Sequence, residues 1–346
     1  MYSFSSIIGQ EAIKDHFQNA LRTGSVSHAY IISGEKESGK ELITRTFAAA
    51  LQCDDLQERK GLLEPCGACL SCLQVQSGNQ PDIIVWPRKE YPKYKVKEDI
   101  RAFLPDVQIR PYRSPWKIYI LEDAETLNVQ CQNALLKTLE EPPAYAVFFL
   151  LANGTENFLP TVLSRCVVMQ IRQVEEGRIA AFLREKKGIP AAQAGLCSRF
   201  SRGNIGRALQ LSQDASFVEA RDRTVRILRE IPSLTADRIT KEAKEIAETG
   251  AAAGFRELAS MWYRDILVYK STGGRGDLIF EEEVQYISNI ADCLPYRALE
   301  KITTALQDAA KREKLSVNAS LTMEMLLLEI RRVHRDASSA DSSFRR

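Results

Sequence analysis

The first half of the chain alternates between short apolar runs and longer amphipathic segments. Five of the runs are rich in β-branched and aromatic residues, a composition typical of buried strands. They are "AYIIS" (29–33), "DIIVW" (82–86), "KIYIL" (117–121), "AVFFLLA" (146–152) and "CVVMQI" (166–171). Near-continuous apolar strands separated by helices predict a parallel sheet that is covered by helices on both faces. We therefore expect an α/β domain of the nucleotide-binding type.

The pattern after Ile171 is helical almost without interruption as far as Val333. The last long helix is expected to begin near Ser320. It carries an apolar stripe with the spacing of one helix face, formed by Leu321, Met325 and Leu328. Such stripes usually belong to a core, but here we favour a neighbouring subunit as the partner.

A glycine-containing segment lies between the first predicted strand and a predicted helix. Its Gly34, Gly39 and Lys40 match a phosphate-binding loop, in which backbone N–H groups and the lysine hold phosphates and a following hydroxyl ligates Mg²⁺. Glu41 stands in place of that hydroxyl residue. The loop carries three carboxylates against two lysines: Glu35, Glu37 and Glu41, with Lys36 and Lys40. One repulsion between unit charges at ~4 Å costs about 4 kcal/mol at an effective dielectric constant of about 20, on the order of a thousandfold in affinity.

A second acidic motif, Glu122-Asp123, follows the predicted strand "KIYIL". In active ATPases with such a loop, the strand ends in Asp-Glu, where the Asp serves Mg²⁺ and the Glu orients the attacking water. The two acids are exchanged here, and displacements of about 1 Å can lower a rate about a hundredfold. The alternative is that Glu122 and Asp123 have no role at a nucleotide site and only mark the end of a strand and the charged start of a helix. We expect a degenerate nucleotide site and no use of ATP by this chain.

Four cysteines have the spacing of metal ligands. Cys66, Cys69 and Cys72 lie in "CGACLSC", and twelve residues separate Cys53 from Cys66. Four thiolates with Cys-x₂-Cys spacing favour a closed tetrahedral site with structural zinc. The alternatives are reduced cysteines that coincide by chance and an iron–sulfur cluster. The ferredoxin run, however, needs a further Cys-Pro where this chain has Gln-Ser.

Composition narrows the choice of environment and partners. The 346 residues carry a formal net charge of +2, so DNA contact would have to come from a local patch rather than from the whole molecule. The longest apolar run, Tyr145–Ala152, is too short to cross a bilayer. The N-terminal residues lack the pattern of a secretory signal. We expect a cytoplasmic protein without membrane contact, in which the cysteines stay reduced.

Four segments taken in order resemble a known family. They are "SHAYIISGEKESGKEL", "PCGACLSC", "LNVQCQNALLKTLEEPP" and "FLPTVLSRC". Together they are similar to the delta-prime subunits of bacterial DNA polymerase III clamp loaders, which are members of the AAA+ family. The resemblance runs from about Ile8 to Leu209. It is weaker beyond, where "VNASLTMEMLLLEI" is similar to the family's last collar helix.

The resemblance implies an α/β AAA+ P-loop domain with an inserted zinc module, a small helical lid domain and an all-α C-terminal collar domain. We place the AAA+ domain at 1–172 with the zinc module at about 53–80, the lid at 173–213 and the collar at 214–335. The polar tail 336–346 is expected to be disordered. The implied partners are gamma/tau and delta subunits in a five-membered ring, which loads the sliding clamp on primer-template DNA.

The resemblance also implies a catalytic role for Arg165 within Ser164-Arg165-Cys166. This arginine would be the finger that reaches into the ATP site of the adjacent subunit, a contribution worth roughly 10³ to 10⁵ in rate. Without the resemblance, Arg165 would merely end a helix before a strand. Two positions depart from the pattern: Gly206 stands where ATP-using relatives have a phosphate-contacting arginine, and Gln80 stands where a histidine often follows the cysteine module.

Two other functions remain open at this point. An ATP-hydrolysing gamma/tau-like subunit of the same loader would share the resemblance, although Glu41 and the exchanged acids argue against it. The other function is that of an unrelated P-loop enzyme with a structural zinc site, such as a kinase. In that case the "SRC" and "ALLKTLEEPP" segments would match the family by chance. Binding of ATP to the chain alone separates both of these from the subunit that donates an arginine.

Overall fold

The computed structural model describes residues 2–86, 101–315 and 317–344. The chain divides into two compact units, residues 1–212 and 213–346. Among the described residues, no helix combines the length and the apolar character that crossing a bilayer requires.

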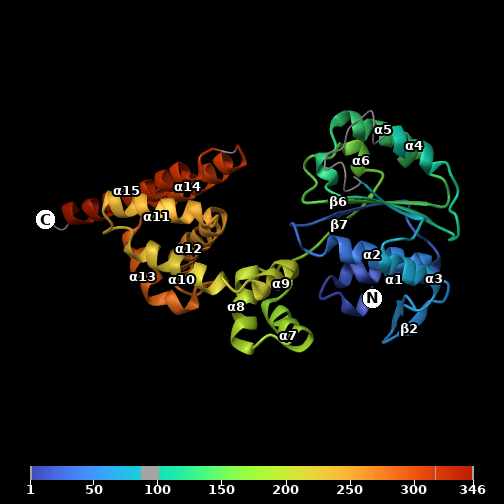
Figure 1. Ribbon diagram of the computed structural model, residues 1–346, viewed down its shortest axis with the longest axis horizontal. Coiled ribbons are helices and arrows are strands. Elements are labelled where there is room, and N and C mark those ends of the chain that lie inside the picture. Colours follow the sequence, from blue (N-terminus) through green and yellow to red (C-terminus); the bar gives the residue numbers. More distant parts are fainter. Residues whose placement is uncertain (1, 87–100, 316, 345–346) are drawn as a thin grey trace. The chain divides into compact units, whose positions relative to one another are not determined.

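A five-stranded parallel sheet forms the centre of the first unit (Figure 1). Its strands lie in the order β4-β5-β6-β1-β7, and every neighbouring pair is parallel. The bounds are β1 Ala29–Ser33, β4 Ile83–Trp86, β5 Lys117–Leu121, β6 Ala146–Ala152 and β7 Val167–Gln170. The five predicted strands and their parallel arrangement are thus confirmed, to within one residue at each end.

Helices cover both faces of the sheet, as the apolar strands predict (Figure 1). One face carries α1 (Glu11–Thr23) and α2 (Lys40–Gln52), and the other carries α4 (Arg101–Val107), α5 (Val129–Glu140) and α6 (Pro160–Leu163). Successive side chains of β6 point to opposite faces. Phe149 therefore packs with Phe17 and Phe47, whose rings are stacked at 4.0 Å, while Phe148 packs with Phe103 on the other face.

Two small elements complete the first unit. The cysteine module contains the antiparallel hairpin β2 (Gln57–Arg59) and β3 (Leu62–Glu64), followed by α3 (Leu70–Ser77). The pattern analysis missed this hairpin because its strands have three residues each. The lid consists of α7 (Glu176–Lys187), α8 (Ala191–Ser201) and α9 (Ile205–Gln213), which enclose their own apolar cluster. Because the lid is grouped with the sheet in one compact unit, the boundary predicted at 172/173 stays a prediction.

Among its described residues, the second unit consists of helices and the segments that connect them. Its helices are α10 (Phe217–Glu230), α11 (Ala236–Glu248), α12 (Ala252–Thr272), α13 (Val284–Cys293), α14 (Tyr296–Lys314) and α15 (Ala319–Phe344). Helix α15 packs against α11 and α14. It continues through most of the stretch predicted to be disordered, because residues 319–344 contain no glycine or proline to end it.

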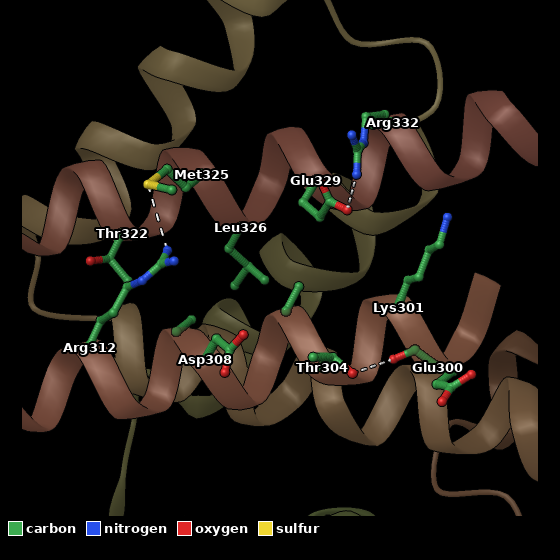
Figure 2. Close-up of a pocket in the computed structure, with 12 residues that line it drawn as sticks. Glu300, Lys301, Thr304, Asp308, Arg312, Thr322, Met325, Leu326, Glu329 and Arg332 are labelled. Atoms are coloured by element: carbon green, nitrogen blue, oxygen red, sulfur yellow. Dashed lines mark hydrogen bonds and ion pairs between the residues drawn. The ribbon is translucent and has the colours of Figure 1, made fainter. Parts of the chain in front are cut away.

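Two of the three residues in the predicted apolar stripe of α15 face away from the core of this unit, and the third, Leu328, is half-buried. Leu321 and Met325 are 53% and 46% exposed, whereas Met323 and Leu327 are buried. Met325 instead borders a groove between α14 and α15, where Arg312 approaches its sulfur at 3.6 Å (Figure 2). The same helix therefore carries two apolar stripes, one that is buried in the unit and one that is left at its surface.

Candidate functional site

The predicted nucleotide-site residues meet at the carboxyl edge of the parallel sheet. The phosphate-type loop follows β1, Glu122-Asp123 follows β5, and Asn153 follows β6. Ends of parallel strands share one edge, which is where ligands bind in open α/β sheets. A pocket of about 450 Å³ lies there and is lined by Gly39, Lys40, Glu41, Glu122, Asp123 and Asn153, with residues of the lid. Gly34 lines a neighbouring pocket on the other side of the loop.

The ammonium group of Lys40 is held by the chain itself. Its Nζ donates to the carbonyl oxygens of Gly34 (2.6 Å) and Glu35 (2.8 Å) and to Asn153 Oδ1 (3.1 Å). Burial lowers the pKa of Lys40, and nearby carboxylates, Glu125 foremost, oppose that shift. An ammonium has three N–H donors. A phosphate would therefore have to displace acceptors that Lys40 already has.

Glu41 points along the helix rather than into the loop. Its Oε1 accepts a hydrogen bond from Arg45 Nε at 2.6 Å, one turn further along α2, and its side chain is 58% exposed. This pairing offsets part of the expected repulsion, because the three carboxylates of the loop now face three cations when Arg45 is included. Nucleotide binding is therefore weakened mainly by the missing hydroxyl ligand and by the internal hydrogen bonds of Lys40. Net negative charge in the loop contributes less.

The lid packs directly on the loop. Asn204, which is 6% exposed, donates through Nδ2 to the carbonyl oxygen of Lys36 at 2.8 Å. A Cβ atom on Gly206 would lie only 2.2 Å from the carbonyl oxygen of Glu37. Glu37 itself has a positive φ of 65°. No side chain, and least of all an arginine, fits at Gly206 unless the loop or the lid moves.

Replacing Gly206 by alanine is expected to destabilise the first unit by about 1–3 kcal/mol, the usual cost of overpacking. Urea unfolding of the purified chain measures this change. Gly195→Ala is the matched control, because a Cβ atom there meets nothing within 4 Å in the middle of α8. The control is expected to be neutral or slightly stabilising. Equal effects of the two substitutions would show that the lid does not rest on the loop.

The four predicted metal ligands converge. The Sγ atoms of Cys53, Cys66, Cys69 and Cys72 all lie within 4.8 Å of one another, and Cys66 and Cys72 are 3.9 Å apart. Four sulfurs bound to zinc at about 2.3 Å form a tetrahedron with edges of about 3.8 Å. The cluster could thus hold a metal ion, and its size and donor set fit zinc.

Backbone donors surround these sulfurs. The N–H groups of Ala68 and Cys69 donate to Cys66 Sγ at 3.4 and 3.3 Å, and the N–H of Cys66 donates to Cys53 Sγ at 3.3 Å. The bond from Cys69, followed by that from Ala68, lowers the pKa of Cys66 to about 7. Hydrogen bonds of this kind stabilise thiolates, which are the form that binds metal. Gly67, with φ 76°, gives the turn its left-handed residue.

The cysteine module is tied to the beginning of the chain. The carboxylate of Glu64, 1% exposed and two residues before Cys66, accepts the N–H groups of Phe4 and Ser5, each at 2.7 Å. Phe4 is fully buried in the cluster that covers the α1/α2 face of the sheet. The cysteine cluster is therefore joined to the core by a buried carboxylate.

Arg165 lies at the opposite edge of the sheet from the phosphate-type loop. It lies two residues before the start of β7, and Val167 of β7 pairs in parallel with Tyr30 of β1. Gly34 lies four residues beyond Tyr30, so about 13 Å of strand separates the start of β7 from the level of Gly34, and Arg165 lies before that start. Arg165 cannot serve the pocket of its own chain.

The three residues of the predicted finger motif have different environments. Arg165 Nη2 is 2.6 Å from Glu140 Oε1, and its Nη1 donates to Thr161 O (2.9 Å) and Ser164 Oγ (3.2 Å). Cys166 packs against the core, and burial raises the pKa of its thiol to about 12. The cysteine thus anchors the segment while the arginine side chain stays 34% exposed.

Sequence reasoning missed Asn153, Glu125 and Asn204. Asn153 bonds Lys40 and also the carboxylate of Glu125, and Asn204 fixes the loop to the lid. A polar residue directly after the buried run "AVFFLLA" was a usable signal for Asn153, because it marks the edge where ligands bind. No comparable signal existed for Asn204, whose partner is a backbone carbonyl 168 residues away.

Comparison with protein families gives one match, the DNA polymerase III, delta subunit family, over residues 9–175. Among characterised relatives, the tau/gamma subunit of DNA polymerase III from Haemophilus influenzae is 31% identical over 240 residues, 68% of this chain and 34% of that protein. The delta' subunit from Bacillus subtilis is 27% identical over 318 residues, 90% of this chain and 92% of that protein.

The chain spans about a third of the length of the first tau and tau/gamma relatives that it matches. Among solved structures, a gamma subunit-related protein from Thermotoga maritima is 17% identical, covers 92% of this chain and 99% of that chain, and gives a TM-score of 0.44.

Proposed function

Because the chain belongs, through residues 9–175, to the clamp-loader subunits of the DNA polymerase III family, we propose that it is a delta-prime-type subunit that does not hydrolyse ATP itself. It presents Arg165 to the ATP site of a neighbouring subunit. Its partners are gamma/tau and delta subunits of a five-membered cytoplasmic ring, which loads a sliding clamp on primer-template DNA.

The observation that carries this proposal is the separation between Arg165 and the loop of its own chain. The two lie at opposite edges of the sheet, with about 13 Å of strand between the start of β7 and the level of Gly34. A guanidinium that is partly exposed and cannot reach its own pocket is suited to act on nucleotide in another subunit. The delta' relative supports the same role, since the match covers 92% of its length against 34% for the tau/gamma relative.

The pocket of the chain itself is poorly suited to catalysis. Lys40 is bound by three acceptors of the chain, Glu41 is paired with Arg45, and the lid packs against the loop at Gly206. We also propose that the four-cysteine cluster binds structural zinc, with Cys53 as the fourth ligand.

Titration of the purified chain with a fluorescent ATP analogue in the presence of Mg²⁺ tests the proposal. We expect no saturable binding at micromolar concentrations, with an ATP-using gamma/tau subunit as the positive control. Saturable, Mg²⁺-dependent binding would instead favour the gamma/tau-like function. That alternative has support in the 31% identity to a tau/gamma subunit.

The exposed stripe of α15 supports a role for the second unit as an oligomerisation collar. Leu321 and Met325 leave apolar surface on α15, and Met325 lines a groove of about 510 Å³ between α14 and α15 (Figure 2). Charged side chains of both signs, Asp308, Arg312 and Glu329, line the same groove. An apolar centre with a polar rim is the usual anatomy of a subunit interface, and we propose that a neighbouring collar helix packs there.

Substitution of both Leu321 and Met325 by glutamate is expected to weaken assembly with the partner subunits at least tenfold, because two charges would be buried in the interface. Size-exclusion chromatography of the reconstituted complex measures this. Both side chains are about half exposed, so the melting temperature of the chain alone should hardly change. Val284→Glu, at an exposed apolar residue of α13 rather than of the α15 stripe, is the control. Normal assembly of the double variant would rule out this surface.

A further inference from the structure

The guanidinium of Arg165 is held in place by contacts from two helices. Thr161 and Ser164, in and directly after α6, accept hydrogen bonds from Nη1, while Glu140, the last residue of α5, forms an ion pair with Nη2. In this ion pair, Nη2 of Arg165 and Oε1 of Glu140 are 2.6 Å apart. Among the three residues in these contacts with Arg165, only Glu140 is charged.

Arginine has a long side chain with many rotamers, so an unrestrained one samples many orientations before it meets a phosphate. The three contacts fix both Nη atoms. The two hydrogen bonds use the donors of Nη1, and the other three of the five N–H donors of the guanidinium make no hydrogen bond in these contacts. Glu140 can therefore stay bound to Arg165 while the arginine contacts a nucleotide.

We propose that Glu140 is a positioning residue for Arg165, which fixes the guanidinium in the orientation presented to the neighbouring ATP site. This role rests on the proposed function of Arg165. Glu140 would touch neither nucleotide nor Mg²⁺. Its effect is to reduce the reorientation that Arg165 needs when the ring closes on ATP.

The sequence supplies a matched control next to Glu140. Glu141 follows it in "LEEPP", is also exposed, and caps the end of α5 through its backbone N–H. The Glu140→Gln and Glu141→Gln substitutions remove the same charge one residue apart. Only the first removes the contact with Arg165.

The first experiment uses the chain alone and does not depend on its function. Phenylglyoxal modifies arginine, and peptide mass spectrometry gives the rate at Arg165. An exposed ion pair is worth a few tenths to about 1 kcal/mol, so E140Q should speed modification by roughly two- to fivefold. E141Q should leave the rate unchanged. Equal rates at Arg165 in the two variants would overturn the proposal.

The second experiment uses the clamp loader assembled with its partner subunits. Single-turnover hydrolysis at the site served by Arg165 should slow by roughly two- to fivefold in E140Q, with the KM for ATP unchanged, and E140D should recover part of the loss. In an R165A background, E140Q should have no further effect.

The outcomes of these experiments separate two kinds of failure. A loader in which R165A slows hydrolysis but E140Q does not would overturn the positioning role alone. The same is true if E140Q slows hydrolysis equally in the presence and absence of Arg165. A loader in which R165A itself has no effect would overturn the proposed function and, with it, this inference.

Discussion

Assembled with its partner subunits, the Arg165→Ala chain is expected to leave one bound ATP per clamp loader unhydrolysed on the timescale of a normal turnover. Hydrolysis at the site that faces Arg165 should slow by roughly 10³-fold or more, because a guanidinium supplied in trans stabilises charge that develops on the transferred phosphoryl group. Affinity for ATP should change little, since that interaction is strongest in the transition state. Single-turnover hydrolysis on primed DNA is the decisive measurement, because other sites in the ring still contribute to the steady-state rate.

Arg184→Ala is a suitable control for this experiment. Arg184 lies on α7 in the same unit, is 59% exposed and pairs with the adjacent Glu185, so its loss changes the net charge by the same amount. The control loader is expected to hydrolyse all of its ATP at the normal rate. If the R165A loader does so too, Arg165 is not a finger.

Loss of one cysteine ligand is the second large effect that we expect. Structural zinc contributes about 10–16 kcal/mol in small domains, or about 3 kcal/mol for each of four ligands. Cys72→Ser should therefore weaken zinc binding by roughly a hundredfold. The module at 53–80 and the core that Glu64 joins to it should then loosen together. Metal analysis by mass spectrometry should give one zinc per wild-type chain and much less in the variant, with faster amide hydrogen exchange around α3.

Cys293→Ser is the control for the metal experiment, because Cys293 is an exposed free thiol outside the cluster. It should retain one zinc per chain. A Cys72→Ser chain that holds zinc as tightly as the wild type would show that the cluster is not the site. Iron with visible absorbance in the wild-type chain would favour the iron–sulfur alternative instead.

The parallel sheet was predictable because its strands are buried on both faces, so that runs such as "AVFFLLA" have no polar interruption. Helix α15 marks the limit of this reasoning. Leu321 and Met325 on one side and Met323 and Leu327 on the other both follow helical spacing. Periodicity alone cannot tell which stripe a unit buries and which it leaves for a partner.

The candidate site likewise has features that local sequence patterns predict and features that depend on contacts between distant residues. The loop, the acidic pair and the four cysteines are local patterns, and each could be located from spacing alone. The partner of Glu41 changed the electrostatic argument, because an arginine one turn away offsets a charge that the sequence appeared to leave in the loop. The roles of Glu140 and Gly206 depend on their contacts with Arg165 and Glu37, which are distant in the sequence. Local patterns therefore could not predict them.

The buried carboxylate of Glu64 has a consequence for the proposed zinc site. It links the residues next to the cysteine cluster with the amides of Phe4 and Ser5, and thereby with the aromatic layer beneath α1 and α2. Loss of the metal should therefore not unfold the cysteine module alone and leave the rest of the first unit intact. It should loosen one cooperative folding unit. The fraction of chains that is competent to join a replication complex is then expected to follow the availability of zinc during synthesis.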